Sequence, residues 1–209
     1  MLFANFVFYI WFVMNERTAI KELQQRIANY ADMKAYEALY KMLFNSMYRF
    51  ALSFVKSKEA SEEIVSDAFV KIWQLGTKLN DIENIKAYLF TITKNFSLNY
   101  ITQNHKVIQL NITGFEFDDI ILFEDPEEIF MSGEIIKRVK KSINELPPQC
   151  RLIFQLVKEE GLSYKEVASI LDISVFTVRN QIGIGLKKLT ESLPAYNVTA
   201  PSPKILIEN

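Results

Sequence analysis

The side chains best suited to bind another molecule lie between Phe176 and Lys187. At helical spacing, this stretch carries an aromatic ring, two cations, an amide and a glycine: Phe176, Arg179, Asn180, Gly183 and Lys187. Cations bind phosphate oxygens, an amide can bind base edges, and a glycine bares the backbone for close approach. The stretch therefore predicts a helix shaped for the major groove of DNA.

The residues before this stretch predict how the helix is positioned. Ser163 and Glu166 have the spacing of a capping box, so a helix should begin at Tyr164. Two turn-forming residues, Asp172 and Ser174, end it, and a second helix should begin near Val175. The residues expected to face inward are Val167, Ala168 and Leu171 on the first helix, and Val178, Ile182, Leu186 and Leu189 on the second. The pattern is a helix-turn-helix, although an ordinary helical hairpin has the same features.

A second group of binding side chains lies on a predicted helix from about Ile85 to Gln103. Between Asn84 and Lys106 there is no acidic residue. The helix interleaves rings, amides and cations: Tyr88, Phe90, Phe96 and Tyr100; Asn95, Asn99 and Asn104; Lys86 and Lys94. Rings stack on unpaired bases and cations hold the backbone, so this composition favours single-stranded or melted nucleic acid. The alternative is that the rings only fill a core.

The sequence offers little for catalysis or metal binding. Cys150 and His105 are the single cysteine and histidine, which excludes an internal disulfide and a zinc site built from these two residue types. We expect Cys150 to pack at the first turn of a helix, and His105 to be solvated or to face a phosphate. No glycine-rich phosphate loop is present. The sequence therefore predicts no catalytic residue, no metal ligand and no cofactor, and an enzyme is the least favoured function.

Composition and periodicity predict an all-α protein made of two small helical domains. The chain has 209 residues, with six glycines, six prolines and 49% hydrophobic residues, as a compact helical protein requires. A formal net charge of −1 argues against indiscriminate coating of nucleic acid, so any DNA contact must come from local basic faces. We predict a first domain at 15–106, an acidic linker at 107–128, a second domain at 129–193 and a disordered tail at 194–209.

The first fourteen residues are almost entirely apolar. The run is too short to span a bilayer and lacks a basic region and a signal-peptide cleavage pattern, so no stable membrane insertion is expected. One hypothesis is that Met14 is the true initiator. The alternative is a short arm, 1–14, that binds a membrane surface or a partner. A peptide containing Phe8 and Trp11 in the endogenous protein would exclude the first hypothesis.

Four blocks of sequence, in order, resemble the extracytoplasmic-function (ECF) group of bacterial sigma factors, the subunits that give RNA polymerase its promoter specificity. They are AYEALY at 35–40, ASEEIVSDAFVKIW at 60–73, IKAYLFTITKNF at 85–96, and LPPQCR at 146–151 followed by the helix-turn-helix. The resemblance covers about Lys21 to Leu193, nearly the whole chain. It implies a sigma region 2 domain and a sigma region 4 domain. It also implies a cytoplasmic protein whose partners are core RNA polymerase, promoter DNA and an anti-sigma factor, with no small-molecule substrate.

The resemblance also implies residue roles. Docking on the coiled coil of the largest polymerase subunit would use Ser66, Asp67, Lys71 and Gln74. Melting of the −10 element and capture of a flipped base would use Asn80, Asn84, Lys86, Tyr88, Lys94, Asn95 and Asn99, with Lys94 and Lys106 on phosphates. At the −35 element, the helix would be positioned on the DNA by Arg179, Lys187 and Lys188. The residues that face base edges would be Phe176, Thr177, Asn180 and Gly183. A good bidentate contact discriminates by about 1–3 kcal/mol, so Asn180 is expected to read an adenine.

Two departures from the family pattern predict weak binding to free DNA. The helix end at Thr102 to Asn104 lacks the arginine cluster common there, and Tyr88 replaces a frequent tryptophan. Gly183 and Gly185 each cost about 1 kcal/mol of helix propensity.

The competing interpretation is a stand-alone helix-turn-helix regulator, which would bind a palindromic site tightly without polymerase. The sequence does not name the promoter, the inducing signal or the anti-sigma factor.

Overall fold

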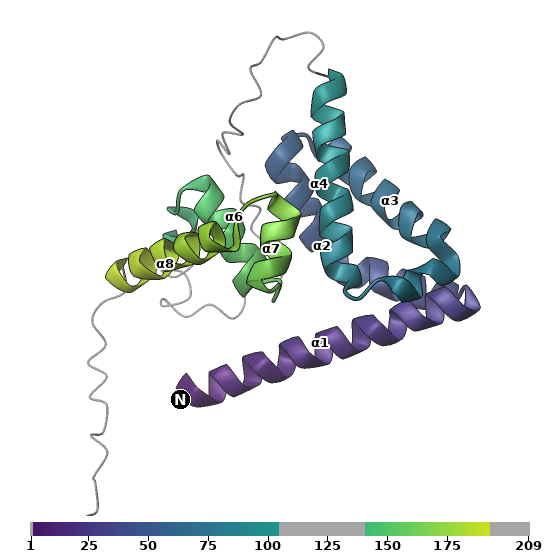
Figure 1. Ribbon diagram of the computed structural model, residues 1–209, viewed down its shortest axis with the longest axis horizontal. Coiled ribbons are helices and arrows are strands. Elements are labelled where there is room, and N and C mark those ends of the chain that lie inside the picture. Colours follow the sequence, from purple (N-terminus) through teal and green to yellow (C-terminus); the bar gives the residue numbers. More distant parts are fainter. Residues whose placement is uncertain (1, 105–140, 193–209) are drawn as a thin grey trace, which may run out of the picture.

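The computed structural model describes residues 2–104 and 141–192, with side chains from residue 16 onward (Figure 1). In these ranges all regular secondary structure is helical, which confirms the all-α prediction. The acidic linker, the C-terminal tail, His105 and Lys106 lie outside the described residues. The helices form two units: the first unit comprises α1 to α4, and the second unit comprises α6 to α8.

The first unit is built around α2 (Met33–Val55), which packs on α1 (Leu2–Tyr30), α3 (Lys58–Leu75) and α4 (Ile85–Asn104). Local sequence sets where these helices begin: Asp32 accepts hydrogen bonds from the first turn of α2, and Ser57 from that of α3. Apolar residues at spacings of three and four then form the core. Its fully buried members include Leu39, Leu43, Met47, Phe69, Ile72, Leu89 and Phe90.

The helix α1 begins at Leu2 and continues through the apolar N-terminal run without interruption. Among the described helices, none is both long and apolar enough to cross a membrane. Where translation begins is not tested by this geometry, so the Met14 hypothesis stays a prediction.

A short 3-10 helix, η1 (Gly76–Asp81), connects α3 to α4 and is held against α1. Gln24 on α1 is buried, and its amide donates hydrogen bonds to the carbonyl oxygens of Leu79 (2.6 Å) and Ile82 (2.8 Å). Because buried carbonyls need partners, these bonds fix the loop that precedes α4.

The second unit comprises α6 (Pro148–Lys158), α7 (Tyr164–Leu171) and α8 (Val175–Ser192). The predicted starts of α7 and α8 are confirmed, and so is the capping box, in which Glu166 N–H donates to Ser163 Oγ and Ser163 N–H donates to the Glu166 carboxylate. Cys150 is fully buried in the first turn of α6, as expected.

The predicted inward face of α8 is wrong at one position. Val178, Ile182 and Leu189 are buried, but Leu186 is 46% exposed. Gly185 takes its place in the stripe, because α6 approaches so closely that a Cβ on Gly185 would lie 3.1 Å from Phe154 Cδ2 and 3.5 Å from Cys150 Sγ. The close packing of the two helices therefore rotates Leu186 toward solvent.

The two units meet where α7 packs beside α4 (Figure 1). By contrast, α8 packs on α6 and α7 and projects away from the first unit.

Candidate nucleic-acid interface

The face of α8 opposite its buried stripe is open. Phe176 is 69% exposed, and Arg179, Asn180, Gly183, Lys187 and Lys188 are also exposed. No atom outside the helix lies within 4 Å of where a Gly183 side chain would begin. This face therefore presents a ring, cations, an amide and bare backbone to solvent together, as a major-groove helix requires.

The start of α8 is fixed by side chains of the turn. Ser174 Oγ accepts a hydrogen bond from the Thr177 N–H at 2.9 Å and lies 2.8 Å from the Thr177 hydroxyl. Thr177 is half-buried in the first turn of α8, and its hydroxyl already has Ser174 Oγ as a hydrogen-bond partner. Helix N-termini favour phosphate groups, so this end suits the DNA backbone.

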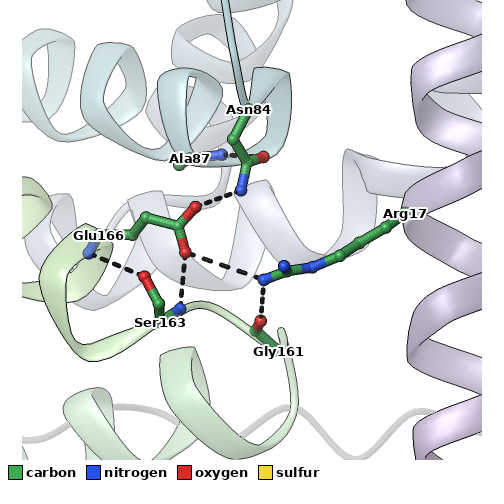
Figure 2. Close-up of polar contacts among 6 residues, drawn as sticks. All are labelled: Arg17, Asn84, Ala87, Gly161, Ser163 and Glu166. Atoms are coloured by element: carbon green, nitrogen blue, oxygen red, sulfur yellow. Dashed lines mark hydrogen bonds and ion pairs between the residues drawn. The ribbon is translucent and has the colours of Figure 1, made fainter.

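Asn80 and Asn84 lie at the two ends of the segment that enters α4. The Asn80 amide donates to the Asn29 side chain on α1 at 2.7 Å. Asn84 caps α4 by accepting from the Ala87 N–H at 3.2 Å, and its own amide donates to Glu166 of α7 at 2.6 Å (Figure 2). Both side-chain amides therefore have hydrogen-bond partners, and the bond from Asn84 to Glu166 joins the first unit to the second.

Lys86 and Lys94 do not face solvent, since each is only 6% exposed. Lys86 Nζ lies 2.9 Å from Glu16 and 2.9 Å from Glu160. Lys94 pairs with Asp172 of the α7–α8 turn. Buried ammonium groups require such partners, because an unpaired charge away from water is costly.

The rest of the predicted −10 surface on α4 is accessible. Asn95 and Asn99 are exposed and Tyr88 is half-buried. Of the four aromatic side chains on this helix, Phe90 is buried in the core, whereas Tyr88, Phe96 and Tyr100 are half-buried. Phe90 therefore fills the core, as the alternative interpretation predicts, whereas a nucleic-acid role for Tyr88, Phe96 and Tyr100 stays a prediction.

The predicted polymerase-docking residues share one face of α3. Ser66, Asp67, Lys71 and Gln74 are all exposed, and Val70 between them is 48% exposed. Since Ala68, Phe69 and Ile72 fill the core from the opposite side, this polar face is not needed for packing in the first unit.

Sequence reasoning missed the residues that join the two units. Arg17 donates to the Gly161 carbonyl at 2.7 Å and lies 3.9 Å from Glu166, as Figure 2 shows. Arg49 lies 3.8 Å from Glu160. An open cavity of about 180 Å³ lies at this contact, and its charged lining comprises Arg17, Glu160 and Glu166 together with Glu16, Lys21, Glu83 and Lys86. Sequence reasoning also missed Gln24, whose bonds to the Leu79 and Ile82 carbonyls lie within the first unit. The signal was its place in an apolar stripe, four residues after Ile20 and three before Ile27, where a polar side chain needs a specific partner.

Two titratable groups in the second unit are perturbed. Burial alone would raise the pKa of Glu166, but hydrogen bonds from Ser163 and Asn84 and the charge of Arg17 together hold that pKa below its ordinary value. Burial raises the pKa of the Cys150 thiol, which donates to the Gln181 carbonyl at 3.2 Å. A neutral, buried thiol is a packing group rather than a nucleophile.

The same two units are recognised by comparison with known proteins. Residues 36–107 match the family model of sigma-70 region 2, and residues 136–189 match that of sigma-70 region 4. The chain belongs to the ECF group of sigma-70 factors. Sigma factors are transcription initiation factors, and the helix-turn-helix is their region 4 DNA-binding domain.

Relatives of this sigma factor align along most of its length. It is 25% identical over 176 residues to the ECF RNA polymerase sigma-E factor of Escherichia coli K12, covering 81% of this chain and 91% of that protein. It is 28% identical over 141 residues to the ECF sigma factor SigM of Bacillus subtilis, covering 66% of this chain and 82% of that one. The sigma factor RpoE of Bartonella quintana, solved in complex with the anti-sigma factor NepR, has a similar fold. Its TM-score is 0.50 at 22% identity, and the match covers 77% of this chain and 97% of that chain.

Proposed function

We propose that this sigma factor directs core RNA polymerase to its promoters by a two-point grip on DNA. The exposed face of α8 reads the −35 element, with Asn180 on a base and Arg179, Lys187 and Lys188 on phosphates. The segment from Asn80 through α4 opens the −10 element, with Tyr88 and the amides of Asn84, Asn95 and Asn99 around a flipped base. The exposed face of α3 docks on the polymerase. The observation that carries the proposal is the α8 face, which exposes every predicted −35 contact except the half-buried Thr177.

The energetics of the −10 step agree with these residue types. Opening a stacked pair costs a few kcal/mol, which stacking on rings and hydrogen bonds to amides can recover without chemistry. No covalent step is needed, and Cys150 is buried in the core. We therefore propose no enzymatic activity and no cofactor.

The proposal includes the cellular setting and partners of an ECF factor. The protein acts in the cytoplasm on core RNA polymerase and promoter DNA, under the control of an anti-sigma factor. The domain boundaries at 15–106, 107–128 and 129–193 belong to the same proposal and are supported by the two family matches.

Transcription in vitro tests the proposal against the stand-alone regulator. With purified core polymerase and a promoter library, the protein should select a set of promoters that core polymerase alone does not use. Gel shifts with double-stranded sites should then show specific binding only when polymerase is present. Tight, specific binding by the protein alone, with no selected transcripts, would overturn the proposal in favour of the regulator.

A further inference from the structure

The buried amide of Gln24 on α1 holds the loop that leads into α4. Its Nε2 donates to the Leu79 carbonyl at 2.6 Å and to the Ile82 carbonyl at 2.8 Å. A side-chain NH2 group has two hydrogens, so both are used on the backbone of this loop. A further bond lies beside them, because the Asn80 amide donates to the Asn29 side chain at 2.7 Å. Three hydrogen bonds therefore join α1 to the loop.

Packing alone does not explain a glutamine at this position. The side chain is 1% exposed and stands between Ile20 and Ile27 in the buried stripe of α1. An apolar side chain of similar size would be buried there without the cost of removing an amide from water. A glutamate would offer only acceptors to two carbonyl oxygens. The residue type therefore matches the two carbonyls rather than the core.

The segment that these bonds hold belongs to the proposed −10 surface. Leu79 is fully buried, whereas the next residue, Asn80, is exposed, and Asn84 caps α4 with its side-chain oxygen. The 3-10 helix η1 is six residues long. Runs of more than about four residues are uncommon in 3-10 helices, because their hydrogen-bond geometry is poor. The loop therefore depends on α1 for its shape.

We propose that Gln24 is a positioning residue for −10 recognition, which holds the loop in the shape that binds the opened strand before DNA arrives. This inference rests on the proposed −10 role of the segment from Asn80 through α4. A preformed loop loses less conformational freedom on binding, so more of the contact energy remains to discriminate between bases. Gln24 acts through the loop, because at 1% exposure its own amide is closed to DNA.

The hold on the loop is tested first, without DNA, by hydrogen exchange of the free full-length protein. Gln24→Met keeps the helix propensity of the side chain and removes both donors. Exchange in peptides covering 76–84 should become on the order of tenfold faster than in wild type, while peptides of α2 and α3 exchange as before. Gln25→Met makes the same change at an exposed position of α1 and should exchange like wild type. Unchanged exchange at 76–84 in Gln24→Met would overturn the proposal.

Base discrimination separates positioning from mere stability. Holoenzyme made with each variant is given a promoter that wild type selects from a library, and the same promoter with single −10 substitutions, and open complexes are measured by permanganate reactivity. Gln24→Met should lower the ratio between the two promoters by on the order of tenfold, as expected if the freed loop holds the binding shape about a tenth of the time. An inactive fraction cancels in this ratio, so lost stability alone would not move it. Discrimination of −35 substitutions should match wild type, and Gln25→Met should match wild type at both elements.

A further variant separates this inference from the proposed function. Asn95→Ala/Asn99→Ala removes two exposed amides of α4 that belong to the proposed −10 surface and lie beyond the loop. If this double variant loses −10 discrimination and Gln24→Met keeps it, the inference fails and the proposed function stands. If only Gln24→Met loses it, the positioning role stands and the assignment of the two asparagines fails. Loss in both variants supports both, and full discrimination in both overturns both.

Discussion

Gly185 is the residue on which the close packing of α8 and α6 depends. A side chain there would meet Phe154, Cys150 and Leu146 at 3.1, 3.5 and 3.6 Å from its Cβ. Gly185→Leu should therefore destabilise the protein by about 1–3 kcal/mol through overpacking. Gly183→Leu is the matched control, because nothing lies within 4 Å of that position, and it should gain up to about 1 kcal/mol from helix propensity. Urea unfolding checks both signs, and similar effects of the two changes would contradict the assigned packing.

Cys150 provides a probe of the same core. Burial raises the pKa of its thiol, so the thiolate fraction near neutral pH should be smaller than that of an exposed cysteine. We expect labelling by a disulfide reagent to be at least about tenfold slower in the native protein than in urea. Since Cys150 is the single cysteine, the whole signal belongs to it. Native labelling as fast as that of the unfolded chain would show that the thiol is accessible.

At the scale of the element, the capping box of α7 should contribute measurably to stability. Ser163→Ala removes the hydroxyl that accepts from the Glu166 N–H and should cost about 0.5–2 kcal/mol. Ser66→Ala is the control, because this exposed serine lies inside α3 and its hydroxyl donates to the Glu62 carbonyl four residues earlier. Alanine there should be neutral or slightly stabilising in urea unfolding. Equal losses in the two variants would argue against a special role for the cap.

The α3 face is predicted to bind core polymerase through exposed charge and amide groups. Asp67→Arg reverses one exposed charge and should abolish co-purification with core polymerase while leaving the unfolding midpoint within experimental error. Glu22→Arg, on the exposed side of α1, is the matched reversal and should bind normally. Retained binding by Asp67→Arg would remove this face from the docking surface.

Sequence predicted the elements well where local spacing decides them. The capping box at Ser163 and Glu166 lies within a single turn, and the structure confirms it. One residue of the inward stripe of α8 was predicted wrongly, because hydropathy favours Leu186 over Gly185. The choice depends on how closely α6 approaches, which is a tertiary property that no helical periodicity contains.

At the scale of the molecule, the contacts between units were out of reach of sequence patterns. Lys94 and Asp172 are 78 positions apart, and Asn84 and Glu166 are 82 apart. Each of these residues also has an ordinary local explanation, as a solvated charge or a helix cap. Only the docking of α7 beside α4 shows that the predicted DNA ligands and these carboxylates are partners.

Glu166, which lies where α7 packs beside α4, makes the stability of the folded protein depend on pH. The pKa of Glu166 is lower in the folded protein than its ordinary value of 4.5, so its charged form stabilises the folded state above pH 4.5. As the pH falls through the lowered pKa, protonation removes this contribution. Glutamine at this position keeps the shape and one acceptor oxygen of the capping box but carries no charge.

Wild type should therefore exceed Glu166→Gln in free energy of unfolding by on the order of 1 kcal/mol at neutral pH. The difference should shrink as the pH is lowered below 4.5 and through the lowered pKa of Glu166. Urea unfolding of both proteins across this range measures it, and Glu145→Gln, an exposed glutamate outside the contact, should follow wild type throughout. A difference between wild type and Glu166→Gln that stays constant with pH would show that the charge of Glu166 does not stabilise the folded protein.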